Sequence, residues 1–203
     1  IQKDLRLSLN MGAEFAKLRD LLQPGMSLDE LVSRGEYLTT RLLADYLHGT
    51  FVDAKDVIQF QYDGSIDFDK TKQCLQPYLK EKGLLVIPGF YGALPSGVIK
   101  VMSRGGSDIT GAILANVIDA NVYENWTDVS GMLVADPRIV TNPRQISRIT
   151  YAELREMSYM GANVLHDESI FPVKQKHSPI NIRNTNHPEN PGTMILEDCE
   201  ELD

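Results

Sequence analysis

The chain has 203 residues, which at roughly 150 residues per domain fits one domain or one and a fraction. Hydrophobic residues make up 42% and charged residues 24%, an ordinary globular composition that excludes disorder as the main state. The 28 acidic residues outnumber the 20 basic ones, and the net charge of −8 argues against a protein that binds a nucleic-acid backbone.

Helical patterns open the chain. Apolar residues at helical spacing predict a helix over 2–22, which ends at Pro24-Gly25. A capping box from Ser27 to Glu30 opens the next helix. The same spacing recurs from Ser33 to Glu36, which predicts that the helix restarts there and continues to about His48. Later elements are predicted as strands at 50–53 and 57–61 and a helix over 68–82, bent near Pro77.

From residue 83 on, strands and helices alternate. The apolar run 83–90 predicts a buried parallel strand that leads into a loop, and 98–101 is predicted as a hairpin arm. Helices are predicted from about residue 107 to Ala120 and over 150–160, and strands over 121–126, 180–183 and 194–196. This alternation indicates an α/β sandwich of layers with a largely parallel sheet.

Cysteine usage and hydropathy indicate the compartment. Cys74 and Cys199 lie far apart and form neither a disulfide framework nor a zinc-ligand spacing, so we expect the reducing cytoplasm. No run approaches the ~18 apolar residues needed to span a bilayer, so no membrane association is expected. The four histidines show no metal-ligand spacing, and no metal held by protein ligands is expected.

The segment 103–110 carries the strongest sign of a ligand site. Gly105 and Gly106 allow a ligand close to the backbone, and Ser107 can cap the following helix, whose free N–H groups favour an anion. Arg104 suits a carboxylate or a phosphate, and Asp108 could hold an ammonium group or orient a cation. The alternative, weighted equally, is a tight turn into a helix, with Asp108 complementing the helix dipole.

Three further positions have a functional and a structural interpretation. Asp128, with Thr127, follows a predicted strand and could accept hydrogen bonds from a ribose or base, or form an Asx-turn. Arg138 could reach a nucleotide phosphate or be a solvated loop cation. Glu36 could contact an ammonium group, but its place in the second capping box favours a cap.

The order of several segments resembles the amino acid kinase family, and within it the aspartokinases. The matching stretches are Gly35-Glu36, 88–92, 103–108, 126–131, 135–140, 161–166, Asn184-Thr185 and 188–193. The resemblance implies a three-layer αβα sandwich with a catalytic domain over 1–196 and an acidic linker or tail over 197–203. Because the chain has no Lys-Phe-Gly-Gly type motif, we expect the family's N-terminal unit to be missing, and the regulatory ACT-type domains to lie beyond the tail.

The resemblance also implies an activity. ATP, with Mg²⁺, would phosphorylate the side-chain carboxylate of L-aspartate, the first step towards lysine, threonine and methionine, in a homo-oligomer. The aspartate site would comprise Asp108 as the catalytic residue with Glu36, Arg104, Gly105, Gly106 and Ser107. The nucleotide site would comprise Thr127, Asp128, Leu133, Asp136, Arg138, Asn163 and Val164.

Two alternatives stay open. One is an amino acid kinase with a different acceptor. The other is a non-catalytic relative of the same fold that serves as a regulatory partner.

Overall fold

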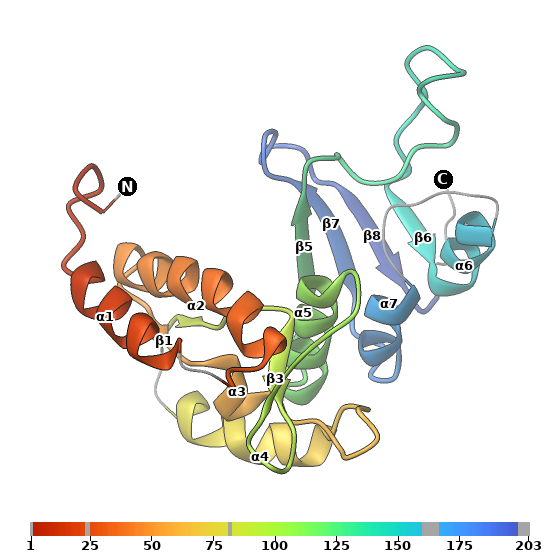
Figure 1. Ribbon diagram of the computed structural model, residues 1–203. Helices are drawn as coiled ribbons and strands as arrows, with labels where there is room; N and C mark the ends of the chain where they lie inside the picture. The colour runs from red at the N-terminus through yellow and green to blue at the C-terminus, as the bar shows by residue number, and fades with distance from the viewer. Residues whose placement is uncertain (1, 23–24, 81–82, 160–166, 199–203) are drawn as a thin grey trace. The chain divides into compact units, whose positions relative to one another are not determined.

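The computed structural model describes residues 2–22, 25–80, 83–159 and 167–198 (Figure 1). By their internal contacts the residues form two units, 1–110 and 111–203, which are described in turn. The predicted division into a catalytic domain over 1–196 and a tail stays a prediction.

The elements of the first unit precede or overlap Thr110. They are α1 (Met11–Leu21), α2 (Leu28–Tyr46), β1 (Thr50–Phe51), α3 (Ala54–Val57), α4 (Phe68–Leu79), β2 (Leu85–Val86), β3 (Tyr91–Ala93), β4 (Ile99–Val101) and the start of α5 (Gly106–Val117).

Side-chain caps set the starts of the first two helices. The Asn10 side chain accepts a hydrogen bond from the Ala13 N–H (3.1 Å), so α1 is shorter than the helix predicted over 2–22. The Ser27 hydroxyl accepts from the Glu30 N–H (3.1 Å), which confirms the predicted start of α2. The predicted restart at Ser33 is wrong. Its hydroxyl donates to the Glu30 carbonyl (2.7 Å) inside one continuous helix.

The strand predicted over 57–61 is also wrong. The Asp53 carboxylate accepts a hydrogen bond from the Lys55 N–H (3.2 Å) and caps the short helix α3. Gln59 and Phe60 then form only isolated bridges, to Ala93 and Ile66. The apolar residues that suggested a strand are buried at the end of this turn.

Two small sheets complete the first unit. β1 pairs with β2 in parallel, as the apolar run predicted, although only Leu85 and Val86 of that run are paired. β3 and β4 form the predicted antiparallel hairpin. The buried side chains of this unit include Val52, Ile58, Leu75 and Tyr91.

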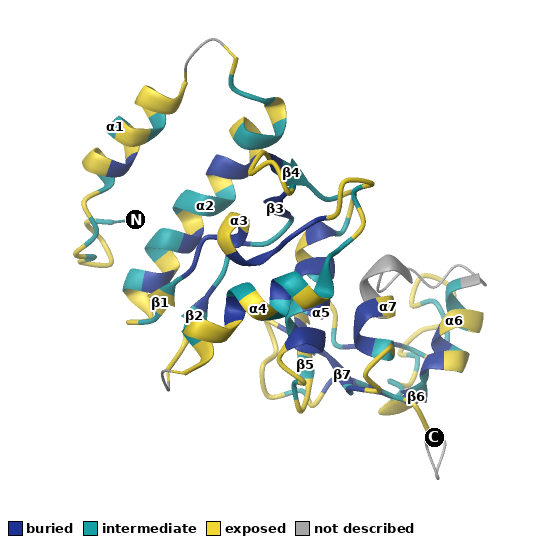
Figure 2. Cartoon of the chain, turned by 90° about the horizontal axis from the view of Figure 1, so that it is seen from below, coloured by how far each residue is buried: buried dark blue, intermediate teal, exposed yellow. Residues whose placement is uncertain are grey.

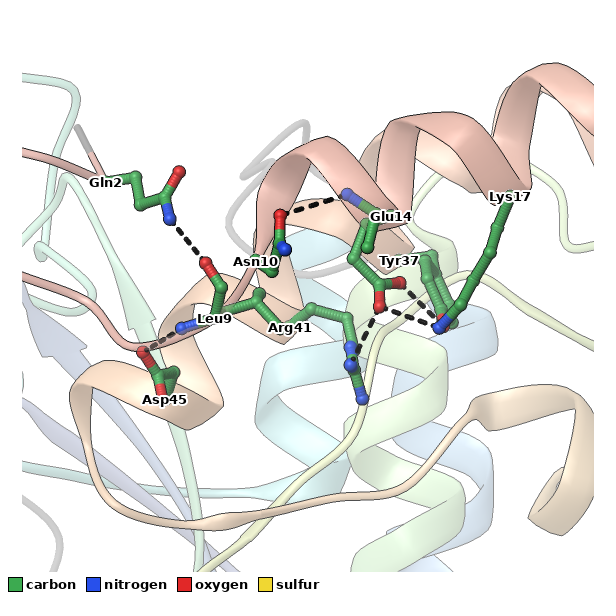
Figure 3. Close-up of polar contacts among 9 residues, drawn as sticks. Gln2, Leu9, Asn10, Glu14, Lys17, Tyr37, Arg41 and Asp45 are labelled. Atoms are coloured by element: carbon green, nitrogen blue, oxygen red, sulfur yellow. Dashed lines mark hydrogen bonds and ion pairs between the residues drawn. The ribbon is translucent and has the colours of Figure 1, made fainter.

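A buried carboxylate joins α1 to α2 (Figure 3). Glu14 is 5% exposed and accepts hydrogen bonds from Lys17 Nζ (3.0 Å) and Arg41 Nη2 (3.1 Å). Burial opposes its ionisation, but the two cations outweigh burial and hold the pKa of Glu14 below its ordinary value. The ionised carboxylate therefore stabilises the contact between the two helices.

Glu14→Gln is expected to lower the free energy of unfolding by about 1–3 kcal/mol at pH 7, because both cations lose their anion. The folded-state pKa of Glu14 is lowered, so this contribution is fully present above its ordinary value of 4.5 and is lost as the pH falls through the folded-state value. Urea unfolding should show a difference that is constant above about pH 5.5 and shrinks below about pH 4.5. Glu156→Gln, at an exposed glutamate of another helix, is the control. A difference independent of pH would contradict this role.

The second unit contains the rest of α5 and six further elements. They are β5 (Tyr123–Thr127), β6 (Arg148–Thr150), α6 (Tyr151–Tyr159), α7 (Asp167–Lys174), β7 (Ile180–Asn184) and β8 (Thr193–Leu196).

The four strands of this unit form one sheet in the order β5-β7-β8-β6. β5 pairs with β7, and β6 with β8, in parallel, while β7 and β8 are antiparallel. The predicted strands and the helix over 150–160 are present within a few residues. β6 and α7 were not predicted, because β6 is only three residues long and Pro172 lies inside α7.

One face of this sheet carries the core. Ile180 and Ile182 of β7 and Ile195 of β8 are fully buried and pack with residues of α5, α6 and α7 (Figure 2). Because side chains alternate along a strand, Glu124, Trp126 and Arg183 lie on the opposite face. No helix among the described residues is long and apolar enough to cross a membrane.

Candidate functional site

The glycine-containing loop between β4 and α5 is shaped by close backbone contacts. Gly105 has φ +80°, a conformation that glycine adopts without strain. A Cβ at Gly106 would lie 2.8 Å from Cβ of Phe90 and 2.9 Å from Cβ of Met102. The Phe90 N–H donates to Thr110 Oγ1 (2.9 Å), and the Met102 N–H donates to the Phe90 carbonyl (2.7 Å). The loop after β2 is therefore fixed against the first turn of α5.

Gly106→Ala is expected to destabilise the chain by about 1–3 kcal/mol, because the new methyl group overpacks the contact with Phe90. The matched control is Gly35→Ala, at an exposed glycine of α2 where a Cβ meets nothing within 4 Å. That change should stabilise by up to about 1 kcal/mol, since alanine favours a helix. Thermal unfolding of both variants checks the opposite signs, and two changes of the same sign would contradict the contact.

The predicted aspartate-site residues lie around this loop. Arg104 and Ser107 are exposed, and Asp108 is half-buried. Ser107 is not the helix cap that the sequence predicted, because α5 already begins at Gly106 and places Ser107 in its first turn. A Cβ at Gly89 would lie 3.0 Å from Ser107 Oγ, so the loop after β2 reaches this turn too. Free N–H groups, a hydroxyl and a guanidinium near one helix start suit an anionic ligand.

Glu36 lies in the middle of α2, so its predicted role in a second capping box is wrong. It follows Asp29 by seven residues and therefore projects from nearly the same face of the helix. The Asp29 carboxylate accepts a hydrogen bond from the Val101 N–H (3.1 Å), which places this face toward the end of β4. Arg104 lies three residues after Val101, which is the last residue of β4. Glu36 is half-buried and has no hydrogen-bond partner among the described residues.

Thr127 and Asp128 lie where β5 ends. The Thr127 carbonyl accepts from the Thr185 N–H (2.8 Å), so the parallel pairing with β7 holds this position. Asp128 is exposed, and its Oδ1 accepts from Thr127 Oγ1 (3.3 Å) rather than from a backbone N–H two residues on. The Asx-turn alternative for Asp128 is therefore wrong. Polar side chains just beyond a parallel strand suit a ligand crevice.

The chain after β5 continues as a two-stranded ribbon that projects from the sheet (green to teal in Figure 1). Leu133 forms an antiparallel bridge with Gln145. At the far end the Arg138 guanidinium binds the Asp136 carboxylate, with Nη2 2.6 Å from Oδ2. This hydrogen bond lowers the pKa of Asp136. Arg138 is thus paired within its own loop through Nε and Nη2.

The predicted residues fall into two groups. Glu36 and 104–108 belong to the first unit, and Thr127, Asp128, Leu133, Asp136 and Arg138 belong to the second. Asn163 and Val164 lie outside the described residues. Among the described residues, no three His, Cys, Asp or Glu side chains are grouped so that they could hold a metal ion.

Residues that shape these loops were missed in the sequence. Thr110 Oγ1 accepts a hydrogen bond from the Phe90 N–H. Thr193 Oγ1 accepts one from the Met132 N–H (2.8 Å) at the base of the ribbon. Both threonines lie at the end of a segment that the sequence analysis singled out, 103–110 and 188–193, but neither was given a role there. Gly131 was a possible signal, because a glycine often marks a close approach of the backbone. In the structure its φ is +93°, and an added Cβ would lie 2.3 Å from Thr193 Oγ1.

Most of the sequence matches a known protein family. The model of the amino acid kinase family matches residues 4–184, and the chain belongs to this family. This membership confirms the predicted α/β class.

Aspartokinases are among the relatives found within that family. The aspartate kinase of Clostridium acetobutylicum is 48% identical, with a TM-score of 0.91, over 99% of this chain and 46% of that one. Aspartokinase III of Escherichia coli, solved with aspartate and ADP, is 29% identical with a TM-score of 0.83, over 97% and 49%. Aspartokinase 3 of Bacillus subtilis is 37% identical over 87% of this chain and 41% of its own length. The resemblance to aspartokinases is confirmed, and the chain spans less than half of each relative.

Proposed function

We propose that the chain is part of an aspartokinase and takes part in the ATP-dependent phosphorylation of the side-chain carboxylate of L-aspartate. The observation that carries the proposal is the 48% identity to an aspartate kinase over 99% of the chain. It is supported by the structure of a second relative with aspartate and ADP, which has the same fold over 97% of the chain.

The first group of residues suits the aspartate site. Arg104 is exposed, and with no hydrogen-bond partner among the described residues it can pair with the α-carboxylate. Glu36 and Asp108 can hold the α-ammonium group. The N–H groups of Gly106 and Ser107, at the start of α5, can bind the carboxylate that accepts the phosphoryl group.

The second group suits the nucleotide. Thr127 and Asp128 can bind the ribose or the base at the end of β5, and Leu133 can pack against the adenosine. Arg138 can bind a phosphate. Asn163 and Val164 complete the proposed nucleotide site.

The reaction joins two anions, so positioning and charge stabilisation are its main requirements. A carboxylate oxygen of aspartate attacks the γ-phosphorus of ATP, the bond to the β,γ-bridging oxygen breaks, and ADP leaves. Mg²⁺ would neutralise the phosphates when bound. Such an ion is held mostly by phosphates and water with one or two carboxylates, so Asp108 or Asp128 can contribute without a cluster of protein ligands.

The setting of the protein is proposed from the resemblance to the aspartokinases and from the cysteine usage. We infer a cytoplasmic homo-oligomer, in which regulatory ACT-type domains belong to the rest of the protein. Neither alternative function is favoured by a particular contact in the described residues.

Titration calorimetry tests the substrate assignment separately from catalysis. L-aspartate should bind, while L-glutamate and D-aspartate should bind at least about tenfold more weakly, because the carboxylate and the ammonium group are recognised together. Equal binding of the three acids would contradict the aspartate site. ADP binding without any aspartate binding would favour another acceptor.

A further inference from the structure

A cavity of about 140 Å³ lies between α1, α2 and the turn that begins α3. All of its lining residues belong to the first unit, and none belongs to the proposed aspartate or nucleotide site. Figure 3 shows one part of its wall, formed by Glu14, Lys17 and Tyr37. The cavity is therefore a separate place where a ligand can bind.

Arg34 is a rigid, buried cation in this wall. It is only 7% exposed. Its Nη2 donates to Ser33 Oγ (2.9 Å), and its Nε donates to the Glu30 carbonyl (3.2 Å). The guanidinium also lies over the rings of Tyr37 and Tyr91, at 5.0 and 5.6 Å from their centroids. These contacts fix one edge of the guanidinium and hold it beside two aromatic rings.

The remaining edge of Arg34 has no complement among the described residues. Nη1 has no hydrogen-bond partner among the described residues, and it is not among the unpartnered atoms that are fully shielded from solvent. No carboxylate of the described residues lies within 4.0 Å of the guanidinium. A buried guanidinium without an anion is costly, so an anion bound from solution is the expected complement.

The other charges of the wall also favour an anion. Three cations and two carboxylates line the cavity. Glu14 already binds Lys17 and Arg41, and Asp53 Oδ1 accepts from the Tyr91 hydroxyl (2.8 Å) and the Lys55 N–H. The Lys55 ammonium forms no ion pair with a described residue. Arg34 and Lys55 are thus the two cations left for a ligand.

Apart from the Tyr37 hydroxyl, which already donates to Glu14 Oε2 (3.5 Å), the rest of the wall is apolar. Leu18 and Leu21 of α1 and Leu38 of α2 line the cavity. They offer no hydrogen bond to the other oxygens of a phosphate or sulfate, and a neutral apolar molecule would leave Arg34 without an anion. We propose that this cavity binds a short aliphatic carboxylate, with the carboxylate on Arg34 and Lys55 and the alkyl chain on the three leucines.

NMR of the full chain with ¹³C-labelled leucine methyl groups tests this site, with sodium valerate as the probe. Saturable shifts of the Leu18, Leu21 and Leu38 methyl resonances are expected. Arg34→Gln should weaken valerate binding at least about tenfold, and Lys55→Gln about threefold. The matched control is Arg19→Gln, which removes an exposed cation of α1 outside the cavity and should change the affinity less than about twofold.

Neutral valeramide and inorganic phosphate separate the two parts of the proposal. Both should bind at least about tenfold more weakly than valerate, because each lacks one of the two recognised groups. Valerate that leaves the three methyl resonances unmoved, or that binds equally to Lys55→Gln and the unaltered chain, would overturn the site. So would phosphate or valeramide that matches valerate. Lys55 is exposed, so its variant keeps the test valid if Arg34→Gln does not fold. The readout is independent of aspartate phosphorylation, so its failure would leave the proposed function standing.

Discussion

Arg104→Ala is expected to weaken the binding of L-aspartate by about 2–3 kcal/mol, or roughly 30- to 150-fold in Kd. The guanidinium is exposed, has no hydrogen-bond partner among the described residues and precedes the two glycines that open α5. Alanine removes a charged donor to the α-carboxylate without removing a hydrogen bond or an ion pair to a described residue. The variant should therefore fold normally, and titration calorimetry with L-aspartate measures the loss directly.

Two controls show whether the loss is specific to aspartate. Arg104→Lys keeps the charge but loses the planar fork, so it should restore only part of the affinity. ADP should bind the alanine variant as before, because the proposed nucleotide residues lie in other segments. An unchanged aspartate affinity, or an equal loss for ADP, would show that Arg104 has another role.

Gly131→Ala is expected to destabilise the second unit by about 3–5 kcal/mol, because strain and overpacking act together. The backbone at Gly131 has φ +93°, which an L side chain rarely adopts. An added Cβ would lie 2.3 Å from Thr193 Oγ1 and 2.8 Å from the Thr193 nitrogen. The same hydroxyl accepts from the Met132 N–H, so the base of the ribbon that carries Asp136 and Arg138 would move.

Gly97→Ala is the matched control for strain without a clash. Gly97 has φ +81°, and a Cβ there meets nothing within 4 Å, so its loss should be only about 1–2 kcal/mol. Urea unfolding followed by circular dichroism compares the two, and the fluorescence of Trp126 reports on the second unit. Equal losses in both variants would show that the contact with Thr193 is unimportant.

Much of the fold could be predicted because local patterns and tertiary contacts agree. The cap at Ser27, the hairpin of β3 and β4 and the parallel pairing of β2 all follow from short sequence signals. The restart at Ser33 failed because a serine inside a helix can donate to the preceding turn instead of capping a new one. The strand over 57–61 failed because the Asp53 cap closes a helical turn first.

The candidate site was predictable as segments but not as contacts. The residues from Arg104 to Asp108 were singled out because glycines, a cation and a helix start coincide. The hydrogen bond from the Phe90 N–H to Thr110 depends on how the chain folds back on itself, which sequence spacing does not encode. The pairing of Arg138 with Asp136, two residues away, depends on the local conformation of the loop. The role of Glu36 changed once α2 proved continuous, since the capping interpretation needed a helix start there.

Trapping of an acyl phosphate by hydroxylamine tests the proposed function most directly. The natural protein that carries these 203 residues is incubated with ATP, Mg²⁺, hydroxylamine and either L-aspartate or L-glutamate. We expect a hydroxamate that requires ATP, Mg²⁺ and L-aspartate together and falls sharply in Arg104→Ala. A protein that binds ADP but forms no hydroxamate from L-aspartate, or forms as much from L-glutamate, would contradict the assignment as an aspartokinase.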